Sequence, residues 1–459
     1  MSLAQKYRPS KYLETVYNHS PLFVQNLIYS GFGFIKMREF KKLQEYVKEL
    51  EAEERLSRDE IAHKQLKKFK KLFQHAKENT AYYAKIFREH DLNVDSFRSI
   101  EDLKQIPLLD KPLVIRNYQD LIASNYQDFE PVNQSSGGTT GTTLKFMMDK
   151  DAYMKKEAEV IHYWNRHGYR PGEKKSIMYR AGVIIPPGKE IKKPWRYDYA
   201  RKMLYLSSYY ASEKLFADYV KVVNTWQPEI MNGLPSAIYL FADYLNRKQI
   251  TLPLEKIMTA SEMLHSFQRE AIEKAFQCKA YDHSGHGEPG MYAAGQCSEG
   301  HYHIPTNNVI VEVSEDGYLI ETSLNNYSIP FIRYKVGDLI DGIYYNCSCG
   351  INTPYFKKIY GRESSLVYTA DGRIISSIGF DQIFKGNNIF LGQILQEEKG
   401  VFILKIVPTA QFTVEDEKDI IAKLKKRVGQ DSKVILKPVK EIPKAKSGKY
   451  NLVVTNIKK

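Results

Sequence analysis

Residues 134–144 carry the clearest chemical signal in this sequence, the run QSSGGTTGTTL. Its three glycines permit left-handed backbone and a close approach to a ligand. Successive backbone N–H groups in such a loop can converge on an anion, and the serine and threonine hydroxyls add donors. A helical-looking segment follows at 151–157. The pattern predicts a phosphate-binding loop. By composition alone a flexible surface loop is the commoner outcome, so the later motifs must decide.

Cysteine and histidine residues form a second candidate site. Cys297 and His303 lie six residues apart, and Cys347 and Cys349 form a Cys-x-Cys pair. Three thiolates and one imidazole complete a tetrahedral zinc site with no open position, so we predict a structural zinc ion without a catalytic role. His301 can replace His303 as the imidazole ligand. The alternative is that these cysteines are free thiols of the folded protein.

Bulk composition narrows the class of function. The chain has 459 residues, 43% of them apolar, and a net charge of +13, so two or three globular domains are expected. The charge suits nucleic acid, an anionic membrane surface or small polyanions. However, the basic residues are scattered beside acidic ones, and the sequence has no nucleic-acid-binding motif. Four cysteines in a chain of this length do not make a disulfide framework.

The sequence has no recognisable targeting or membrane-spanning segment. The first six residues lack the apolar core of a signal peptide, and no apolar run approaches the ~18 residues of a membrane span. We therefore expect a cytoplasmic protein, either a monomer or a homodimer. The apolar stretch 23–35, interrupted by Gly31 and Gly33, can make a peripheral membrane contact. Its polar face is poor, so burial inside the protein is the expectation.

The elements that must position these residues follow from the periodicity of apolar residues. Residues 1 to about 130 look mostly helical, with a capping-box pattern at 57–60 and apolar residues at helical spacing from 61 to 76. Helices and strands alternate from 145 to 360, where Ser212 is placed to cap a helix. Strands are predicted at 176–179, 183–185, 257–260, 309–313 and 318–322. This is α/β organisation, with sites at strand ends.

The pattern changes after residue 361. A strand at 401–407, an amphipathic helix at 415–428 and a strand at 434–436 predict a small βαβ-like unit. The chain then reaches a basic loop, PKAKSGK at 443–449. We therefore predict an N-terminal domain over 1–360, including a helical lead-in over 1–130, and a C-terminal domain over 361–459.

Five stretches, in order along the chain, resemble the motifs of adenylate-forming (acyl-CoA synthetase-like) ligases. They are SGGTTGTTL at 136–144, YDHSGHGE at 281–288, IPFIRYKVGD at 329–338, the hinge pair Gly361-Arg362 and the lysine motif Ser447-Gly448-Lys449. The resemblance covers residues from about 60 to 459 and is greatest to the phenylacetate–CoA ligase group, in particular its CapK-like capsular-polysaccharide branch. NGLPS at 232–236 and CSCG at 347–350 are also similar to that branch. One glycine-rich loop is weak evidence, but five ordered motifs strongly support the fold.

The resemblance implies a role for each motif. The glycine-rich loop holds the β- and γ-phosphates of ATP with Thr140 near the metal, Glu288 binds Mg²⁺, and Asp338 accepts hydrogen bonds from the ribose. Lys449, on a mobile C-terminal lid, brings a positive charge to the α-phosphate or acyl oxygen, and Arg333 is also placed in the catalytic set. The expected nucleotide-binding residues are Ser136, Gly137, Gly138, Thr139, Thr140, Gly141, Thr142, Ala260, Ser261, Glu262, Asp282, His283, Ser284, Gly285, Glu288, Asp338 and Arg362. In some members of the branch, similar cysteine and histidine positions carry zinc. Taken singly, each charged residue is more often a surface or salt-bridging group.

Several positions depart from the family pattern. Ser284 stands where an aromatic residue is usual, and Gly287 removes a hydroxyl before the glutamate. Thr143 replaces the loop proline, and Ser364 and Ser365 replace acidic residues after the hinge pair. These changes put stacking on adenine and hinge behaviour in doubt, and they are the basis for a weakened or non-catalytic alternative.

The predicted fold is α/β, with a large multi-sheet N-terminal adenylate-forming domain and a smaller α+β C-terminal lid domain. The predicted activity is ATP-dependent, AMP-forming activation of a carboxylate, with transfer of the acyl group to a thiol such as coenzyme A or to an amine. The resemblance places this activity in surface polysaccharide biosynthesis. Two alternatives stay open. One is an adenylyltransferase that moves AMP to a hydroxyl group, and the other is a degenerate nucleotide-binding protein.

Overall fold

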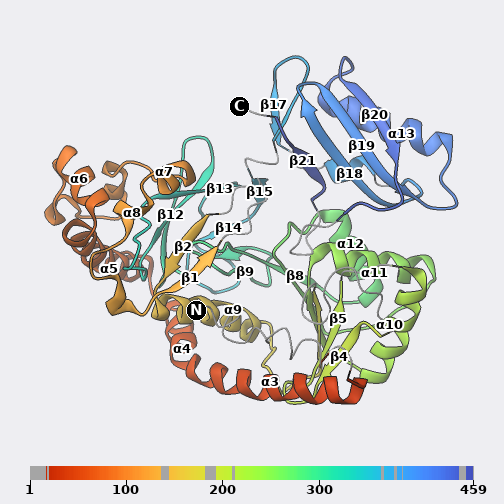
Figure 1. The fold of residues 1–459 in the computed structure, drawn as a ribbon, viewed down its shortest axis with the longest axis horizontal. Coiled ribbons are helices and arrows are strands. Elements are labelled where there is room, and N and C mark those ends of the chain that lie inside the picture. Colours follow the sequence, from red (N-terminus) through yellow and green to blue (C-terminus); the bar gives the residue numbers. More distant parts are fainter. Residues whose placement is uncertain are drawn as a thin grey trace. The chain divides into compact units, whose positions relative to one another are not determined.

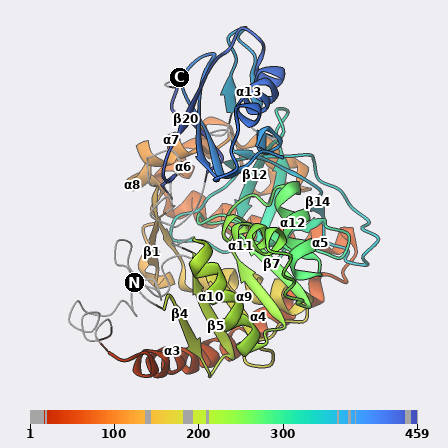
Figure 2. The same ribbon diagram turned by 90° about the vertical axis from the view of Figure 1, so that its right-hand side faces the viewer.

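The computed structural model describes residues 17, 20–135, 144–180, 193–208, 212–362, 366–376, 380–384, 386–443 and 451–457, drawn in Figures 1 and 2. The chain divides into two compact units. The first contains residues 1–174, 197–202 and 281–358, and the second contains residues 175–196, 203–280 and 359–459. The predicted boundary at 361 lies next to the start of the last segment of the second unit, and the division into 1–360 and 361–459 stays a prediction.

Helices open the first unit, as predicted. They are α3 (Leu22–Lys42), α4 (Gln44–Glu53), α5 (Arg58–Asn79), α6 (Ala81–Glu89), α7 (Lys111–Arg116) and α8 (Tyr118–Leu121), with short 3-10 turns at Val94–Ser96, Glu101–Gln105 and Tyr126–Phe129. The capping box is confirmed, because the Ser57 side chain accepts from the Glu60 N–H and the Glu60 side chain accepts from the Ser57 N–H. The apolar residues of α5 enter a core that also contains Phe331 and Tyr334.

The strands of the first unit are antiparallel. A hairpin of β1 (Val132–Ser135) and β2 (Lys145–Met148) flanks the glycine-rich loop, with Ser135 opposite Lys145. A second sheet runs β11 (Val309–Val313), β12 (Tyr318–Ser323) and β13 (Tyr334–Ile340). A third has the order β14 (Tyr355–Phe356), β10 (Tyr302–His303), β9 (Ala294–Gln296) and β8 (Ala280–Ser284). The predicted strands at 309–313 and 318–322 are confirmed.

The second unit contains a parallel sheet in the order β7 (Lys256–Ala260), β6 (Ile230–Gly233), β3 (Ser176–Arg180) and β5 (Met203–Ser207). Its helices are α10 (Glu213–Trp226), α11 (Pro235–Arg247) and α12 (Ser266–Phe276). Ser212 caps α10 as predicted, by accepting from the Leu215 N–H at 3.2 Å. The strands at 176–179 and 257–260 are confirmed, and the one predicted at 183–185 lies outside the described residues.

The C-terminal part of the second unit has a core of its own. Its strands are β15 (Ile359–Arg362), β16 (Leu366–Tyr368), β17 (Ile374–Ser376), β18 (Ile389–Glu398), β19 (Val401–Pro408), β20 (Lys433–Pro438) and β21 (Val453–Thr455), with a 3-10 turn at Phe380–Ile383 and helix α13 (Val414–Val428). The predicted βαβ unit is confirmed, because β19 and β20 pair in parallel on either side of α13. The sequence analysis did not predict β18, which pairs with β19 and β21.

Helix α3 corrects one expectation, because its apolar side chains are not buried. Phe23, Leu27 and Phe34 are 66%, 62% and 59% exposed. The buried side of the helix is polar instead. There Asn26 and Ser30 accept hydrogen bonds from the Tyr197 and Tyr199 N–H groups, at 3.1 and 3.0 Å. These bonds satisfy one backbone N–H group of β4 (Trp195–Asp198) and that of Tyr199, the residue after it. Polar side chains of α3 therefore face the strand. Among the described residues, no helix is long and apolar enough to cross a membrane.

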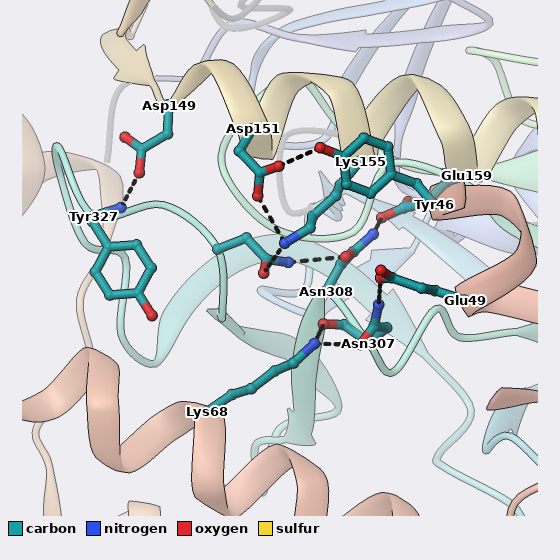
Figure 3. Close-up of polar contacts among 11 residues, drawn as sticks. Tyr46, Glu49, Lys68, Asp149, Asp151, Lys155, Glu159, Asn307, Asn308 and Tyr327 are labelled. Atoms are coloured by element: carbon teal, nitrogen blue, oxygen red, sulfur yellow. Dashed lines mark hydrogen bonds and ion pairs between the residues drawn. The ribbon is translucent and has the colours of Figure 1, made fainter. Parts of the chain in front are cut away.

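A buried carboxylate joins α9 (Lys150–Arg166) to a loop of the same unit. Asp149, before α9, accepts from the backbone N–H groups of Tyr327 at 2.6 Å and Ser328 at 2.9 Å (Figure 3). In return, the Asn326 side chain accepts from the Asp149 N–H at 2.8 Å. Asp149 is 2% exposed, so these groups have almost no access to water.

Replacing Asp149 with alanine should therefore destabilise the protein by about 2–3 kcal/mol, because two buried backbone donors lose their acceptor. Urea unfolding followed by circular dichroism measures this change. Lys150→Ala is the matched control. It removes an exposed ion pair with Glu130 and should change the unfolding free energy by less than about 0.5 kcal/mol. Equal effects of the two substitutions would contradict the role given to Asp149.

Candidate functional site

The four predicted zinc ligands lie together in the first unit. One donor atom from each of Cys297, His303, Cys347 and Cys349 lies within 4.8 Å of the other three. The Cys297 and Cys347 sulfurs are 3.8 Å apart, and the Cys349 sulfur is 3.3 Å from Nε2 of His303. Residues 297 and 303 bracket the turn between β9 and β10, and the Cys-x-Cys pair comes from a loop about fifty residues later. The arrangement fits the soft thiolates and imidazole that zinc prefers.

The surroundings of His303 support its selection over His301. Nδ1 of His303 lies 3.0 Å from the Thr353 carbonyl, which directs Nε2 towards the sulfurs, as second-shell acceptors do in metal sites. His301 stacks on Tyr355 with 4.6 Å between ring centroids, and its Nδ1 lies 3.3 Å from the Cys347 sulfur. Burial raises the pKa of the Cys349 thiol to about 12, so a thiolate here requires a compensating cation. The donor set therefore fits a closed structural zinc ion.

We predict that the purified protein contains one zinc ion per chain by elemental analysis, and that Cys349→Ser lowers this content and the melting temperature. Zinc should also be lost as the pH falls, because protons compete with the metal for the thiolates. Cys278→Ser is the control, since Cys278 lies outside the cluster and should keep the metal. Metal-free protein with unchanged thermal stability would contradict the assignment.

The stretch 281–288 leaves β8 and places its polar groups in different surroundings. Asp282 is buried, and its carboxylate accepts from the Tyr302 hydroxyl at 2.9 Å. The His283 ring packs against the Tyr163 ring with 4.8 Å between their centroids, and Ser284 is the last residue of β8. Gly285 is required by space, because a Cβ there would overlap the Tyr292 backbone. The nucleotide-binding roles of these residues remain predictions.

His286 connects the predicted magnesium ligand to a buried acid, and the sequence analysis missed it. Its Nδ1 lies 3.4 Å from the Glu288 carboxylate, and its Nε2 lies 2.8 Å from Glu321. Burial opposes a charge on this imidazole, but the two carboxylates outweigh burial and raise the pKa of His286 to about 10. A buried imidazolium thus stands beside Glu288. The identity of its partner could not be read from the sequence, because Glu321 comes from β12.

Two buried carboxylates hold the segment that follows Glu288. Glu321 accepts from the Met291 N–H at 2.8 Å, and Glu159 of α9 accepts from the Tyr292 and Ala293 N–H groups, both at 2.8 Å. The other oxygen of Glu159 accepts from the Asn308 side chain at 2.6 Å. Figure 3 shows that this network continues outward. Asn325 donates to the Asn308 side chain and accepts from Lys155. Asp151 in turn pairs with Lys155 and accepts from the Tyr46 hydroxyl. The segment 289–293 is therefore held from two sides.

Lys156 adds a cation to the same region. Its ammonium donates to the Gly287 carbonyl at 2.8 Å and lies 4.2 Å from the centroid of the Tyr292 ring. Burial lowers the pKa of Lys156 to about 8, although Glu157, Glu159 and Glu288 act in the opposite direction. Lys156 thus contacts the 281–288 motif at the peptide bond between Gly287 and Glu288.

The buried carboxyl of Glu159 generates a pH-dependent prediction. Burial raises the pKa of Glu159 to about 7 from its ordinary value of 4.5, because burial outweighs the three hydrogen bonds that favour the carboxylate. The folded protein therefore holds a proton that the unfolded chain releases. Stability from this group is complete below pH 4.5 and is lost as the pH rises to about 7, by about 3 kcal/mol at most.

Glu159→Gln should flatten this part of the stability curve, because a neutral amide does not titrate. The measurement is urea unfolding of both proteins across this pH range. Glu89→Gln changes an exposed acid and should leave the pH dependence of the unfolding free energy unchanged. Parallel curves for wild type and Glu159→Gln would contradict the raised pKa.

The stretch 329–338 has two left-handed backbone positions. Arg333 has φ of +52°, and its guanidinium contacts Glu312 at 3.0 Å and the carbonyls of Lys104 and Ile106. These are the contacts of a structural residue, and its catalytic role stays a prediction. Gly337 has φ of +90° and lies in a β-bulge of β13. On the two sides of this bulge, Lys335 pairs with Ile320 and Leu339 pairs with Tyr318. This bulge sets the direction of Asp338, which is half-buried.

Ala260 ends β7 in the second unit, and Ser261 and Glu262 follow it. Ser261 has φ of +73°, an uncommon conformation for a residue with a side chain and one that is enriched at ligand sites. The Glu262 carboxylate accepts from the Ser236 N–H at 3.0 Å, at the N-terminus of α11. The structure thus brings the predicted adenine-binding stretch next to the 232–236 loop.

The same strand ends carry buried polar groups without described partners. Among the described residues, neither side-chain polar atom of Asn232, at 3% exposure, has a hydrogen-bond partner, and neither does the hydroxyl of Ser236. Asn232 lies in β6, whose neighbours β3 and β7 run parallel to it. Ligands bind at the carboxyl ends of such strands, and unsatisfied buried polar atoms are costly unless a ligand or water completes them.

Other predicted residues lie outside the described part of the chain. They are the loop Ser136, Gly137, Gly138, Thr139, Thr140, Gly141, Thr142 and Thr143, together with Ser364, Ser365 and Lys449. Arg362 ends β15, next to Gly361 with φ of +102°. The proposed roles of these residues are not tested by the geometry.

Comparisons with known sequences agree with the motif order. The family model described as the CapK C-terminal domain matches residues 367–456. Protein CapK of Staphylococcus aureus is 25% identical, and the alignment covers 97% of this chain and 100% of that protein. The phenylacetate-coenzyme A ligase of Thermus thermophilus is 23% identical over 79% of this chain and 80% of its own length.

Solved structures show the same fold. A 2-hydroxyisobutyryl-CoA ligase in its postadenylation state, in complex with R3-HIB-AMP, has a TM-score of 0.65 at 17% identity, and the match covers 88% of this chain and 91% of that one. The same ligase in its thioesterification state, in complex with 2-HIB-AMP and CoA, has a TM-score of 0.55. The predicted α/β architecture is therefore confirmed.

Proposed function

We propose that this chain, which belongs to the CapK-like group of the adenylate-forming superfamily, is an AMP-forming carboxylate ligase that passes its acyl group to the thiol of coenzyme A or to an amine. The observation that carries the proposal is the match along nearly the whole chain to Protein CapK, in the presence of all five ligase motifs in order. The phenylacetate-coenzyme A ligases among its relatives support the reaction class.

Two bond exchanges make up the proposed reaction. The substrate carboxylate attacks the α-phosphate of ATP, which forms acyl-AMP and releases pyrophosphate. The thiol or amine then attacks the acyl carbon, the proton of the nucleophile is released, and AMP leaves. A carboxylate is a poor electrophile, and its attachment to AMP provides the leaving group. Protein groups must therefore offset negative charge near the phosphates.

Glu288 is the residue that we assign to Mg²⁺ with the triphosphate. Magnesium prefers carboxylate oxygen and usually takes one or two protein carboxylates alongside phosphates and water. Glu288 fits because its side chain is 14% exposed and the His286 imidazolium orients it from one side. When bound, the ion would neutralise phosphate charge, with Thr140 as a further hydroxyl near it.

The acyl substrate is proposed to bind beside Asn232 and Ser236. The unpartnered amide and hydroxyl at these positions favour an acid that carries its own hydrogen-bonding groups, since an apolar acid would leave them unsatisfied. Tyr239, which is half-buried, supplies aromatic surface in the same unit. Surface polysaccharide synthesis is the proposed setting, on the resemblance of the sequence motifs to the CapK-like capsular-polysaccharide branch.

The proposal is tested by carboxylate-dependent exchange of radiolabelled pyrophosphate into ATP, screened over aryl, amino and sugar acids. Lys449→Ala should lower the exchange rate by about 10²–10³-fold, because it removes a positive charge from the reacting phosphate. Lys446→Ala is the matched control from the same basic stretch and should retain the rate within about twofold. An unchanged rate in Lys449→Ala would refute the catalytic assignment.

The two alternatives give different results in the same experiment. An adenylyltransferase would form a stable AMP ester of a hydroxyl compound with no need for a carboxylate. A degenerate nucleotide-binding protein would bind MgATP without turnover across the whole panel. Ser284 and Gly287, which replace usual motif residues, are the observations behind this last alternative.

A further inference from the structure

Helix α3 exposes several large apolar side chains, whereas the residues that it buries are Gln25, Asn26 and Gly33, unlike a helix on a globular core. Phe23, Leu27 and Phe34, the most exposed of its apolar residues, are separated by four and seven positions. At 3.6 residues per turn these spacings place all three side chains on one side of the helix. An apolar line of this kind on an exposed helix indicates a surface that contacts something apolar.

The inward side fixes how the helix is turned. Asn26 and Ser30 hold the backbone of residues 197 and 199, and the Ser30 hydroxyl also donates to the Asn26 carbonyl at 2.9 Å. Gly33 lies against the Asp198 side chain so closely that any Cβ would overlap the carboxylate. These contacts fix the rotation of α3 with Phe23, Leu27 and Phe34 exposed, and both views draw α3 beside β4 (Figures 1 and 2). The apolar line is therefore held facing outward.

Basic residues extend the same line. Arg38 and Lys41 come four and seven positions after Phe34, so they lie on the side that carries the exposed apolar residues, and both are exposed. The Arg38 guanidinium stands 5.4 Å from the centroid of the Phe34 ring. Glu39 is the single acid of the helix and is paired with Lys36 at 2.6 Å. The helix thus combines an apolar stripe with an excess of positive charge at one end.

We propose that α3 is a peripheral membrane-binding helix that lies in the surface of an anionic bilayer. Phe23, Leu27 and Phe34 enter the boundary between headgroups and acyl chains, and Arg38, Lys41 and Lys42 contact lipid phosphates.

Charge complementarity selects this partner. The chain carries a net charge of +13, so an anionic lipid surface attracts it, whereas a second copy carries the same positive charge. If the proposed function holds, the attachment would place the ligase at a membrane surface.

The test is sedimentation of the full chain with vesicles of phosphatidylcholine alone and of phosphatidylcholine mixed with phosphatidylglycerol. The wild type should bind the anionic vesicles, and added salt should weaken the binding. Replacing Phe23, Leu27 and Phe34 together with serine should weaken it about tenfold or more. Arg38→Gln with Lys41→Gln should reduce the preference for anionic lipid. A separate Phe23→Trp variant should show a blue shift of its fluorescence with anionic vesicles.

Serine at Ile115 and Val414, two apolar residues exposed by 46% and 61% elsewhere, is the matched control and should leave vesicle binding unchanged. Circular dichroism should show the same fold for all variants, because every altered side chain is exposed. The proposal is overturned by equal binding to both lipid compositions, by undiminished binding of the triple variant, or by equal loss in the control. A concentration-dependent dimer that is lost in the triple variant, with no vesicle binding, would instead assign the surface to a second copy of the chain.

Discussion

The segment after Glu288 depends on two carboxylates that are removed from water. Glu159 and Glu321 together accept three backbone N–H groups of residues 291–293, and Glu321 also pairs with His286. Burying charge is costly unless it is paired and hydrogen-bonded, so this arrangement holds only while all its members are present. It joins α9, β12 and the predicted magnesium ligand in one polar network. The network gives the second half of the 281–288 motif, which follows β8, a defined position outside a regular element.

The cysteine cluster serves the same unit in a different way. It joins the turn between β9 and β10 to the loop at 347–350. A closed metal site there would add metal–ligand bonds to the small apolar cluster around Tyr355. Nearby, Glu54 is held by His162 and Arg166, and although burial opposes its charge, these partners lower the pKa of Glu54 to about 2. Charge pairing, and the predicted metal ligation, thus add to the packing of Tyr355 against His301 and Tyr344 in this region.

Three residues with left-handed backbone lie in or beside the predicted motifs, although others lie elsewhere in the chain. Ser261, Arg333 and Gly337 all have positive φ, and each lies within or beside a stretch that resembles a ligase motif. Such conformations are uncommon outside glycine and are retained where the surrounding structure determines them. The inverted polarity of α3 is a further departure from the usual pattern, since its polar residues stabilise an adjoining strand and its apolar residues are exposed. The positive φ angles lie near the proposed nucleotide site, and the exposed apolar residues of α3 form the proposed lipid contact.

The sequence alone determined the local elements and the chemistry of the motifs. Caps at Ser57 and Ser212 and the strand at 257–260 follow from short-range patterns, and the cluster of predicted zinc ligands follows from residue types whose metal chemistry is distinctive. Only tertiary structure decided that His286 pairs with Glu321, and that α3 turns its apolar side outward. These outcomes depend on groups brought together from distant parts of the chain, and periodicity shows which side chains share a face but not what that face meets.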